Sequence, residues 1–291
     1  MNKLSSKSIG ITFMILSAGI FGFTPVLVRF AFEGGANSVT MIFLRATISL
    51  PLLAAIMLFM KIPFKVPRER MKEMFFGALG FALTGIFLYS AFYHINVGLA
   101  VTIHYTNPVL VMLVSVFFFR EKMGMYKWIA LALVMTGIVL LTGAIDSYNF
   151  VGIGFALMSA ICVTSNILVV GRSKLHELHY LTITFYFILL QCIIAFSFGL
   201  AIGQLAFALT PAAWVYTAIV SILVSVFAVT LYQQGVLKAG STTSSLVSCL
   251  EPITSIVFGA VFLAEILTPL NIIGGFMVIS SVVIISLAKK E

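Results

Sequence analysis

Long uninterrupted runs of apolar residues dominate this chain and limit what it can fold into. Hydrophobic residues make up 61% of the 291 residues and charged residues only 9%, against about 45–50% and about 25% in soluble domains. The runs are about 20 residues long, which is the length of a helix that crosses a bilayer. A helix also satisfies its own backbone hydrogen bonds inside hydrocarbon. The sequence therefore predicts an all-α integral membrane protein.

Ten such runs fit the chain, joined by short polar connections. Their approximate bounds are 9–29, 39–60, 73–93, 98–119, 125–143, 150–170, 180–203, 211–234, 241–263 and 270–288. The longest polar connection, 61–72, is too short to hold a soluble catalytic or binding domain. Lys3 and Lys7 precede the first run, as in a signal peptide, but the run continues past any reasonable cleavage site. We therefore expect an uncleaved first span.

The basic residues test this count and orient the spans. With the N-terminus in the cytoplasm, ten spans place 15 of the 17 lysines and arginines in cytoplasmic segments, as the positive-inside rule requires. These 15 residues are Lys3, Lys7, Lys61, Lys65, Arg68, Arg70, Lys72, Arg120, Lys122, Lys127, Arg172, Lys174, Lys238, Lys289 and Lys290. The exceptions are Arg29 and Arg45. We predict a multi-pass plasma-membrane protein, of the bacterial inner-membrane type, with both termini cytoplasmic.

Composition also narrows the partners. The net charge of +8 does not indicate nucleic-acid binding, because the basic residues lie in short connections and form no basic face on a folded module. Cys162, Cys192 and Cys249 are scattered without metal-ligand spacing, so we expect no metal site. No G-x-x-x-x-G-K-[ST] motif is present, so we expect no ATP use and no cofactor. The expected partners are a small-molecule substrate and the lipid bilayer. Short connections suit a functional monomer, with a homodimer as the alternative.

The two halves of the chain resemble each other. GITFMILSA from Gly10 and GIGFALMSA from Gly152 share five of nine residues at an offset of 142. NPVLVMLVSVFFFREKM at 107–123 and EPITSIVFGAVFLAEIL at 251–267 align at an offset of 144. Each half holds five spans, and because five is odd, the second half enters the membrane from the opposite side. We predict two inverted five-helix repeats, 1–146 and 147–291, which is the recurrent architecture of secondary transporters.

The chain resembles the drug/metabolite transporter superfamily and, within it, the EamA-type ten-helix transporters. The resemblance spans roughly residues 10–288 and is carried by the duplicated five-span unit, FLRA at 43–46 and LEP at 250–252. Each half also has a proline followed by a glutamate after twelve residues, Pro108 with Glu121 and Pro252 with Glu265. The resemblance implies the transporter fold and makes both glutamates architectural. Such proteins are associated with export of amino acids, other metabolites and drugs, and with some uptake.

Glu251 is a carboxylate placed deep in a predicted span. It lies about eleven residues into 241–263, or about 16 Å from the cytoplasmic end. A charge at that depth costs at least about 2.5–3.5 kcal/mol, so it must face protein or a water-filled cavity. Three roles remain open for it. Glu251 could bind a cationic or amino-bearing substrate, carry a coupling proton because burial disfavours its charged form, or serve as a structural ion beside Arg45 or His104.

The repeat gives Glu251 a set of partners. Ser248 shares its helix face, and His104 and Asn107 occupy the corresponding face of 98–119. Inverted repeats bring the two faces together near the midplane. We therefore expect a substrate cavity lined by His104 and Asn107 on one side and by Ser248 and Glu251 on the other. His104 could also hold a coupling proton near pH 7, with a hydrogen-bonded packing role as the alternative.

Other polar residues within spans are further candidates for substrate binding. Arg45 could bind a carboxylate, pair with Glu251, or extend to the outer interface through its long side chain. Tyr89, Asn166, Gln191 and Gln233 could line the site or could form interhelical hydrogen bonds.

The sequence thus favours a secondary transporter that moves a small metabolite, such as an amino acid, by alternating access. Export follows from the resemblance alone. Proton coupling is favoured because Glu251 and His104 are the titratable groups expected at the centre. The alternative is a drug or organic-cation exporter in which Glu251 binds the cation. We expect no enzyme, because no H-E-x-x-H motif or Ser/His/Asp set lies at one depth.

Overall fold

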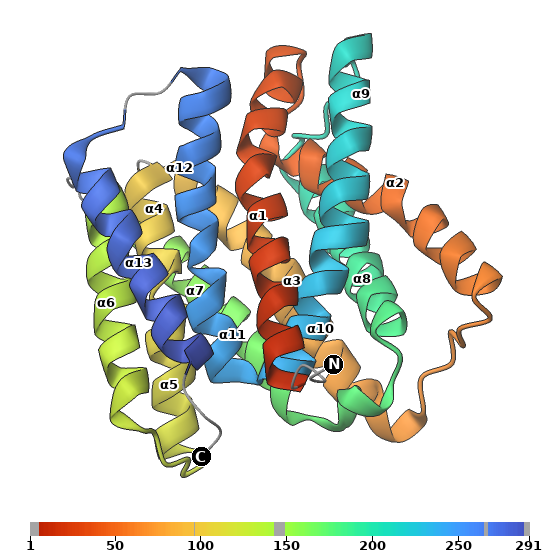
Figure 1. Cartoon of the computed structure of the whole chain (residues 1–291). Helices are drawn as coiled ribbons and strands as arrows, with labels where there is room; N and C mark the ends of the chain where they lie inside the picture. Colours follow the sequence, from red (N-terminus) through yellow and green to blue (C-terminus); the bar gives the residue numbers. More distant parts are fainter. Residues whose placement is uncertain (1–5, 96, 143–148, 265–266, 288–291) are drawn as a thin grey trace.

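The computed structural model describes residues 6–95, 97–142, 149–264 and 267–287. Within these ranges the chain forms helices and no strands. Nine helical segments of the described chain are long and apolar enough to cross a bilayer, and Met125–Leu141 is a shorter apolar tenth. The helices pack side by side as a bundle (Figure 1). The prediction of an all-α membrane protein with ten spanning segments is confirmed.

Both halves follow the same order of segments. The first half contains α1 (Ser6–Glu33), α2 (Ser38–Phe59), the short η1 (Arg68–Arg70), α3 (Met71–Phe92), α4 (Val97–His104), α5 (Asn107–Phe117) and α6 (Met125–Thr142). The second half contains α7 (Phe150–Arg172), the short η2 (Lys174–Glu177), α8 (Tyr180–Ala201), α9 (Pro211–Val220), η3 (Ser221–Ala228), α10 (Val229–Ala239), α11 (Ser241–Ser248), α12 (Leu250–Leu263) and α13 (Pro269–Leu287). The predicted boundary at 146/147 lies outside the described residues, as do Lys3, Glu265, Lys289 and Lys290.

Close contacts at one end of the bundle show that the halves are inverted. Gly10 lies near the start of α1, and a side chain there would collide with Ala239 at the end of α10. Gly171 lies near the end of α7, and a side chain there would collide with Ser241 at the start of α11. The start of the first helix in one half and the end of the first helix in the other therefore share one side. The predicted inverted repeats are confirmed.

Helix packing follows the same two-fold relation. The first helix of each half packs along the third span of the other half, α1 on α10 and α7 on α3. The second spans pack on each other, α2 on α8, and so do the fifth, α6 on α13. In the last pair, side chains at Gly137 and Gly274 would each collide with the other residue's backbone, so both positions need a residue without Cβ.

Two spans are broken at matching positions. The sequence predicted continuous helices over 98–119 and 241–263, whereas α4 ends at His104 before α5, and α11 ends at Ser248 before α12. Proline removes the hydrogen bond to the carbonyl four residues earlier and clashes with that carbonyl. For Pro108 and Pro252 these carbonyls belong to His104 and Ser248, the last residues of the two half-helices. The paired prolines therefore explain why both breaks fall at the same place in the repeat.

A third helix irregularity lies in the third span of the second half, which packs against α1 and α2. The sequence predicted a helix over 211–234, whereas the observed segment runs from Pro211 to Ala239 and contains the π-helical turn η3. A π turn inserts a residue into the helix and often marks a functional region. Here it packs against α1 and α2 and shifts the face that α10 presents to the bundle interior.

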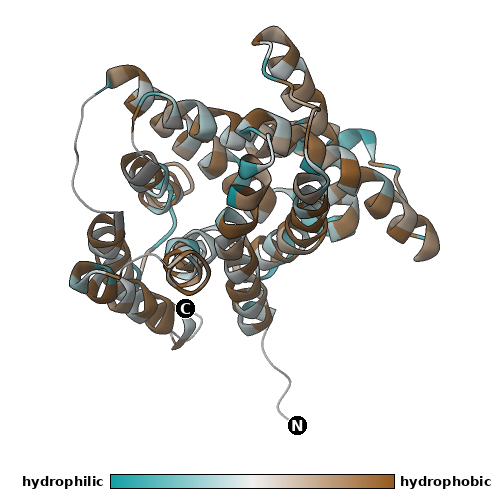
Figure 2. Cartoon of the chain, turned by 90° about the horizontal axis from the view of Figure 1, so that it is seen from above, coloured by the Kyte–Doolittle hydropathy of each residue, from teal (hydrophilic) through white to brown (hydrophobic). Residues whose placement is uncertain are grey.

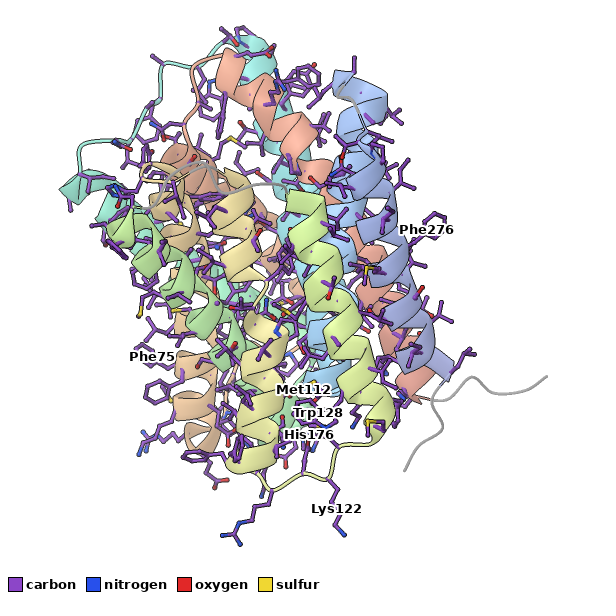
Figure 3. The ribbon with its side chains drawn as sticks, turned by 90° about the vertical axis from the view of Figure 1, so that its left-hand side faces the viewer. Phe75, Met112, Lys122, Trp128, His176 and Phe276 are labelled. Atoms are coloured by element: carbon purple, nitrogen blue, oxygen red, sulfur yellow. The ribbon has the colours of Figure 1, made fainter. Side chains whose placement is uncertain are left out.

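Large apolar side chains cover the outward faces of the helices. Phe276 is 67% exposed and Phe75 is 51% exposed, and both extend away from the bundle (Figure 3). Seen from above, the helices are coloured mostly as hydrophobic (Figure 2). Apolar surface on this scale would cause a soluble protein to aggregate, but it matches the hydrocarbon of a bilayer.

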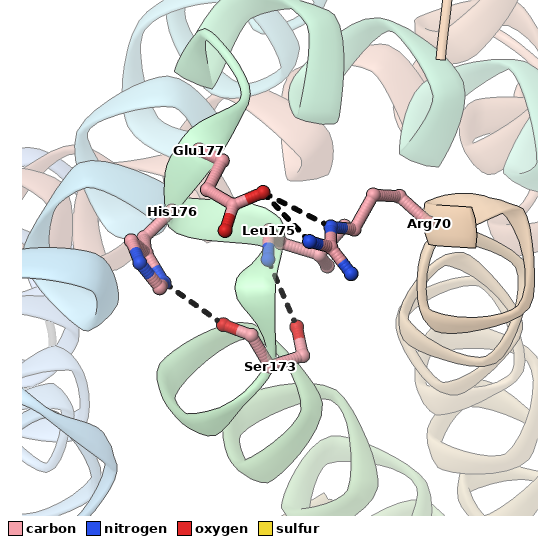
Figure 4. Close-up of polar contacts among 5 residues, drawn as sticks. All are labelled: Arg70, Ser173, Leu175, His176 and Glu177. Carbon is pink, nitrogen blue, oxygen red and sulfur yellow. Dashed lines mark hydrogen bonds and ion pairs between the residues drawn. The ribbon is translucent and has the colours of Figure 1, made fainter. Parts of the chain in front are cut away.

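Basic side chains gather at one end of the bundle, called the basic end below and formed by 61–72, 118–127, 172–179 and 238–240. Lys122 and His176 mark it in Figure 3. Arg70 donates from Nε and Nη2 to Oε2 of Glu177 at 3.2 and 2.8 Å (Figure 4). This hydrogen bond lowers the pKa of Glu177 below its ordinary value. Arg172 forms a second ion pair, with its Nη2 2.9 Å from Oε2 of Glu121. The first pair joins the connection before α3 to η2, and the second joins the connection after α5 to the end of α7.

Candidate functional site

Glu251 lies at the break between α11 and α12. It is the eleventh of the 23 residues in the spanning segment Ser241–Leu263, and it lies in the first turn of α12. The free N–H groups at a helix start carry partial positive charge, which favours a carboxylate there by about 0.3–1 kcal/mol. The break therefore supplies a polar position for a carboxylate near mid-membrane.

Two tyrosines lie close to this carboxylate. The hydroxyl of Tyr105 lies close to the Glu251 carboxylate and interacts with it electrostatically. Tyr105 belongs to the break between α4 and α5, so the two matching breaks meet at this point. Tyr232 of α10 lies within electrostatic range of the same carboxylate. Phenol rings can hydrogen-bond an anion through the hydroxyl or hold a cation over the ring face.

Arg45 is directed into the bundle. Its Nη2 donates to Oε1 of Gln191 on α8 at 3.2 Å, so the side chain is held by α8 rather than extended to the outer interface. Its charge lies within electrostatic range of Tyr89 and Glu251. Its Nε is enclosed by protein and has no partner among the described residues. The guanidinium therefore keeps an unused donor at the centre of the molecule.

Arg45 and Glu251 attract each other without touching. The two side chains lie within electrostatic range of each other, but no ion pair joins them directly within the described chain. Both side chains are only partly buried. Arg45 comes from the first repeat and Glu251 from the second. The arrangement places one cation and one anion at the repeat interface, each with capacity to bind a ligand.

His104 occupies a different place from the one expected. Its Nδ1 is 2.9 Å from Oγ of Ser159 on α7, and that hydroxyl donates to the carbonyl of Thr84 on α3 at 3.0 Å. The break after His104 turns the chain, so the position beside Glu251 belongs to Tyr105. His104 is 8% exposed and lies against α7 and α3. A continuous helix would have kept His104 on the face predicted for the cavity.

Asn107 completes the first break. Its Nδ2 donates to the carbonyl of His104 at 3.1 Å, which is the carbonyl that Pro108 deprives of its helical donor. Oδ1 of Asn107 is buried and has no partner among the described residues. In the second break, Ser248, which is equivalent to His104, donates from Oγ to the carbonyl of Ser245 at 2.9 Å and stays partly buried.

The remaining candidates lie on neighbouring helices. Tyr89 borders a narrow cavity between α2, α3 and α8. Asn166 donates from Nδ2 to the carbonyl of Gly77 at 2.9 Å, while its Oδ1 has no partner in the described chain. Gln233 is fully buried, and neither atom of its amide has a partner among the described residues.

Unpaired buried polar atoms are therefore frequent in this region. Ser225 of η3 and Ser244 of α11 add two buried hydroxyls without partners in the described residues. A buried polar group without a partner costs about 1–3 kcal/mol, so several such groups in one protein need a physical explanation. Water or a bound substrate would supply the missing partners. Most of these groups lie on α5, α7, α10 and α11, and α7 and α11 each pack on the other three of these helices. Ser225 lies on η3, which contacts α10.

Reasoning from the sequence missed Tyr105 and Tyr232. The sequence does contain a signal for Tyr105. This residue lies two positions before Asn107, next to the proline break, and it aligns with Cys249 in the second repeat. A helical-wheel argument that ignores the break puts Tyr105 on the wrong face. Tyr232 has no comparable signal, since its direction depends on the π turn in η3.

The side chains gathered at this site carry opposite charges and hydrogen-bonding groups. Among the described residues no three His, Cys, Asp or Glu side chains lie close enough together to hold a metal ion. The site offers one carboxylate, one guanidinium, phenols and amides. Such groups recognise a small polar molecule that carries charge.

A model of the EamA-like transporter family matches residues 8–143 and 150–287. An uncharacterized transporter of Bacillus subtilis (strain 168), YcbK, is 21% identical over 287 residues, covering 94% of this chain and 91% of its own. A solved structure titled only as the crystal structure of a protein matches with a TM-score of 0.80 at 16% identity, covering 97% of both chains. This last match concerns the fold alone.

Proposed function

Because the chain belongs to the EamA-like transporter family, we propose that it exports a small metabolite with both an amino group and a carboxylate, such as an amino acid. Multi-pass insertion and transport of a small substrate follow from the family and the fold. The identity of the substrate, the direction of transport and the energy source for transport are our proposals. The main support is the arrangement of Arg45 and Glu251, which face one region from opposite repeats without forming an ion pair.

An amino acid complements this pair of charges. Its carboxylate would accept hydrogen bonds from Arg45, including one from the unpaired Nε. Its ammonium group would bind Glu251, with Tyr105 and Tyr232 around it. Charged groups in a membrane interior must be paired or solvated, so a zwitterion would satisfy both residues at once.

The two breaks suit alternating access. Half-helices that end at mid-membrane can tilt separately on either side of a central site. The inverted repeats then provide two related conformations, one open to each side. Under the positive-inside rule, the basic end supports a cytoplasmic location for this side of the bundle and for both termini. The membrane we propose is the plasma membrane.

A comparison of the two breaks supports proton coupling through Glu251. Asn107 gives a side-chain N–H to the carbonyl that its proline deprives of a donor. Glu251 occupies the equivalent position before Pro252, but a carboxylate has no proton to give. Protonated Glu251 could donate to the Ser248 carbonyl as Asn107 donates to that of His104. Proton binding would then close the second break and compete with binding of an ammonium group.

A second candidate function is export of organic cations. The observation that favours it is the position of Tyr105 and Tyr232 beside Glu251. Phenol rings around a carboxylate form the kind of site that binds quaternary ammonium ions. In this case Arg45 would be structural, held by Gln191.

A thermal-shift screen separates the two functions. The purified protein would be melted with amino acids, polyamines, quaternary amines and organic acids at several pH values. A ligand that binds the folded state raises Tm, by an amount set by its concentration relative to Kd. We expect an amino acid to give the largest shift, and the shift to fall at low pH as protons compete for Glu251.

The variant Arg45→Gln sharpens this screen. Loss of a charged hydrogen-bond donor costs about 1.5–3 kcal/mol of binding, or roughly a tenfold to hundredfold weaker Kd. We expect Arg45→Gln to abolish the shift with amino acids and to leave any shift with quaternary amines unchanged. Unchanged amino-acid binding in this variant would contradict the proposed role of Arg45, and quaternary amines as the sole hits would favour the second function.

A further inference from the structure

A groove of about 270 Å³ lies between α3 and α8 on the surface of the bundle. Its lining is almost wholly apolar and consists of Val66, Met71, Met74, Phe75, Ala78, Tyr186, Leu189, Leu190 and Ile193. Phe75 and Ile193 are 51% and 54% exposed, so the groove opens towards the surroundings of the bundle and not into its core. This site is separate from the one around Glu251.

The groove runs from the basic end into the membrane. Val66 belongs to the connection before α3, and the lining continues from Met71 to Ala78 on α3 and from Tyr186 to Ile193 on α8. At about 1.5 Å per residue, the seven residue steps along each helix give a length of roughly 10 Å. That length and the apolar lining suit the part of one acyl chain that lies next to the lipid headgroup.

The opening of the groove is held in a fixed shape. Oγ1 of Thr182 donates to the carbonyl of Pro63, and the hydroxyl of Tyr186 donates to the carbonyl of Phe64, both at 3.0 Å. The ion pair of Arg70 with Glu177 holds the other side of the connection. These contacts attach the connection to α8 and η2, so the groove does not depend on a loose loop.

Basic side chains surround this opening. Five basic and two acidic residues give 61–73 a net charge of +3. Glu177 neutralises Arg70, whereas Lys65, Arg68 and Lys72 are exposed and form no ion pair with the described residues. Lys65 is next to Val66, and Lys72 is next to Met71, so both adjoin lining residues of the groove. A phosphate at the membrane surface would lie within their field.

We propose that this groove binds one anionic phospholipid, with an acyl chain between α3 and α8 and its phosphate at Lys65, Arg68 and Lys72. Each lysine or arginine near a membrane surface contributes about 1 kcal/mol to binding of anionic lipid, or about a fivefold change in Kd. The apolar groove favours a ligand with an acyl chain, and the basic residues favour a ligand with negative charge. The site connects the third span of one repeat with the second span of the other.

Native mass spectrometry of the full-length protein in detergent tests the proposal. Phosphatidylglycerol and phosphatidylcholine with identical chains would be titrated separately, and glycerol phosphate would serve as the chain-free anion. We expect phosphatidylglycerol to bind more tightly than phosphatidylcholine, and glycerol phosphate to bind weakly. The triple variant Lys65→Gln, Arg68→Gln, Lys72→Gln should lose most of this preference.

Two further variants make the result decisive. Lys122→Gln with Lys127→Gln removes basic residues at the same end but away from the groove, and should keep the preference. Ile193→Trp fills the deep part of the groove at an exposed position and should weaken both lipids. Equal binding of the two lipids by the wild type, or an unchanged preference in the triple variant, would overturn the proposal. Glycerol phosphate binding as tightly as the lipid would overturn the role of the chain.

Discussion

Glu251→Gln is expected to lower transport by roughly tenfold to a hundredfold at limiting substrate concentration. The amide keeps the size of the side chain and removes the negative charge. A hydrogen bond to a charged group contributes about 1.5–3 kcal/mol, which corresponds to this range of rates. The amide also mimics the uncharged form of Glu251. Uptake of the labelled substrate into proteoliposomes should therefore be slow and should lose its dependence on pH.

A matched control removes a carboxylate elsewhere. Glu33 is exposed at the end of α1, far along the chain from both breaks, so Glu33→Gln should transport as the wild type does. Binding measured by thermal shift distinguishes a lost substrate contact from a lost proton. If Glu251→Gln transports normally and keeps the pH profile, Glu251 has a structural role only. If it binds substrate normally but transports slowly, coupling alone has been lost.

Gly22→Ala is expected to destabilise the protein and to reduce transport together. Gly22 lies on α1 where α12 crosses it, and a Cβ there would collide with the side chain of Thr254 and lie 2.8 Å from the backbone N of Ser255. Oγ1 of Thr254 donates to the carbonyl of Ala18 at 3.0 Å, and this contact would also be displaced. Overpacking costs about 1–3 kcal/mol. Because α12 carries Glu251, displacement of α12 should misplace the carboxylate as well.

Gly19→Ala is the control on the same helix. Outside its own stretch of α1, no atom of the described residues lies within 4 Å of a Cβ built at Gly19, so alanine there meets open space. Replacing a helical glycine with alanine gains about 0.5–1 kcal/mol. Tm should therefore fall for Gly22→Ala and stay level or rise slightly for Gly19→Ala, as measured by thermal unfolding in detergent. Equal Tm values for the two variants would show that α1 and α12 do not pack closely at Gly22.

The architecture could be predicted from sequence because its signals extend over many residues. Apolar runs, the alternation of basic connections and a repeat offset maintained over both halves all point to one fold. The prolines at 108 and 252 also carried local information, since each removes a hydrogen bond at a known distance along the chain. Taken together with the offset, they could have indicated matching distortions, although two continuous spans were predicted there.

The site was harder to predict because it depends on how the chain turns at the breaks. His104 follows the expected periodicity up to the last residue of α4, and then the helix ends. Tyr105 consequently takes the position beside Glu251, and His104 bonds to Ser159. Arg45 was left with three possible directions, and its contact with Gln191 depends on the packing of α2 on α8. Packing between distant segments leaves no periodic signal in sequence.

Accessibility of the second break tests the central claim most directly. Ser248 would be changed to cysteine in a chain whose Cys162, Cys192 and Cys249 are replaced, and membrane-impermeant thiol reagents would be applied from either side of oriented vesicles. Leu246→Cys is the control, because Leu246 is fully buried two residues away. We expect Ser248→Cys to react from both sides, to be protected by the substrate found in the screen, and Leu246→Cys to stay unreactive. A Ser248→Cys thiol that never reacts, or that reacts equally with and without substrate, would contradict a transport site at the paired breaks.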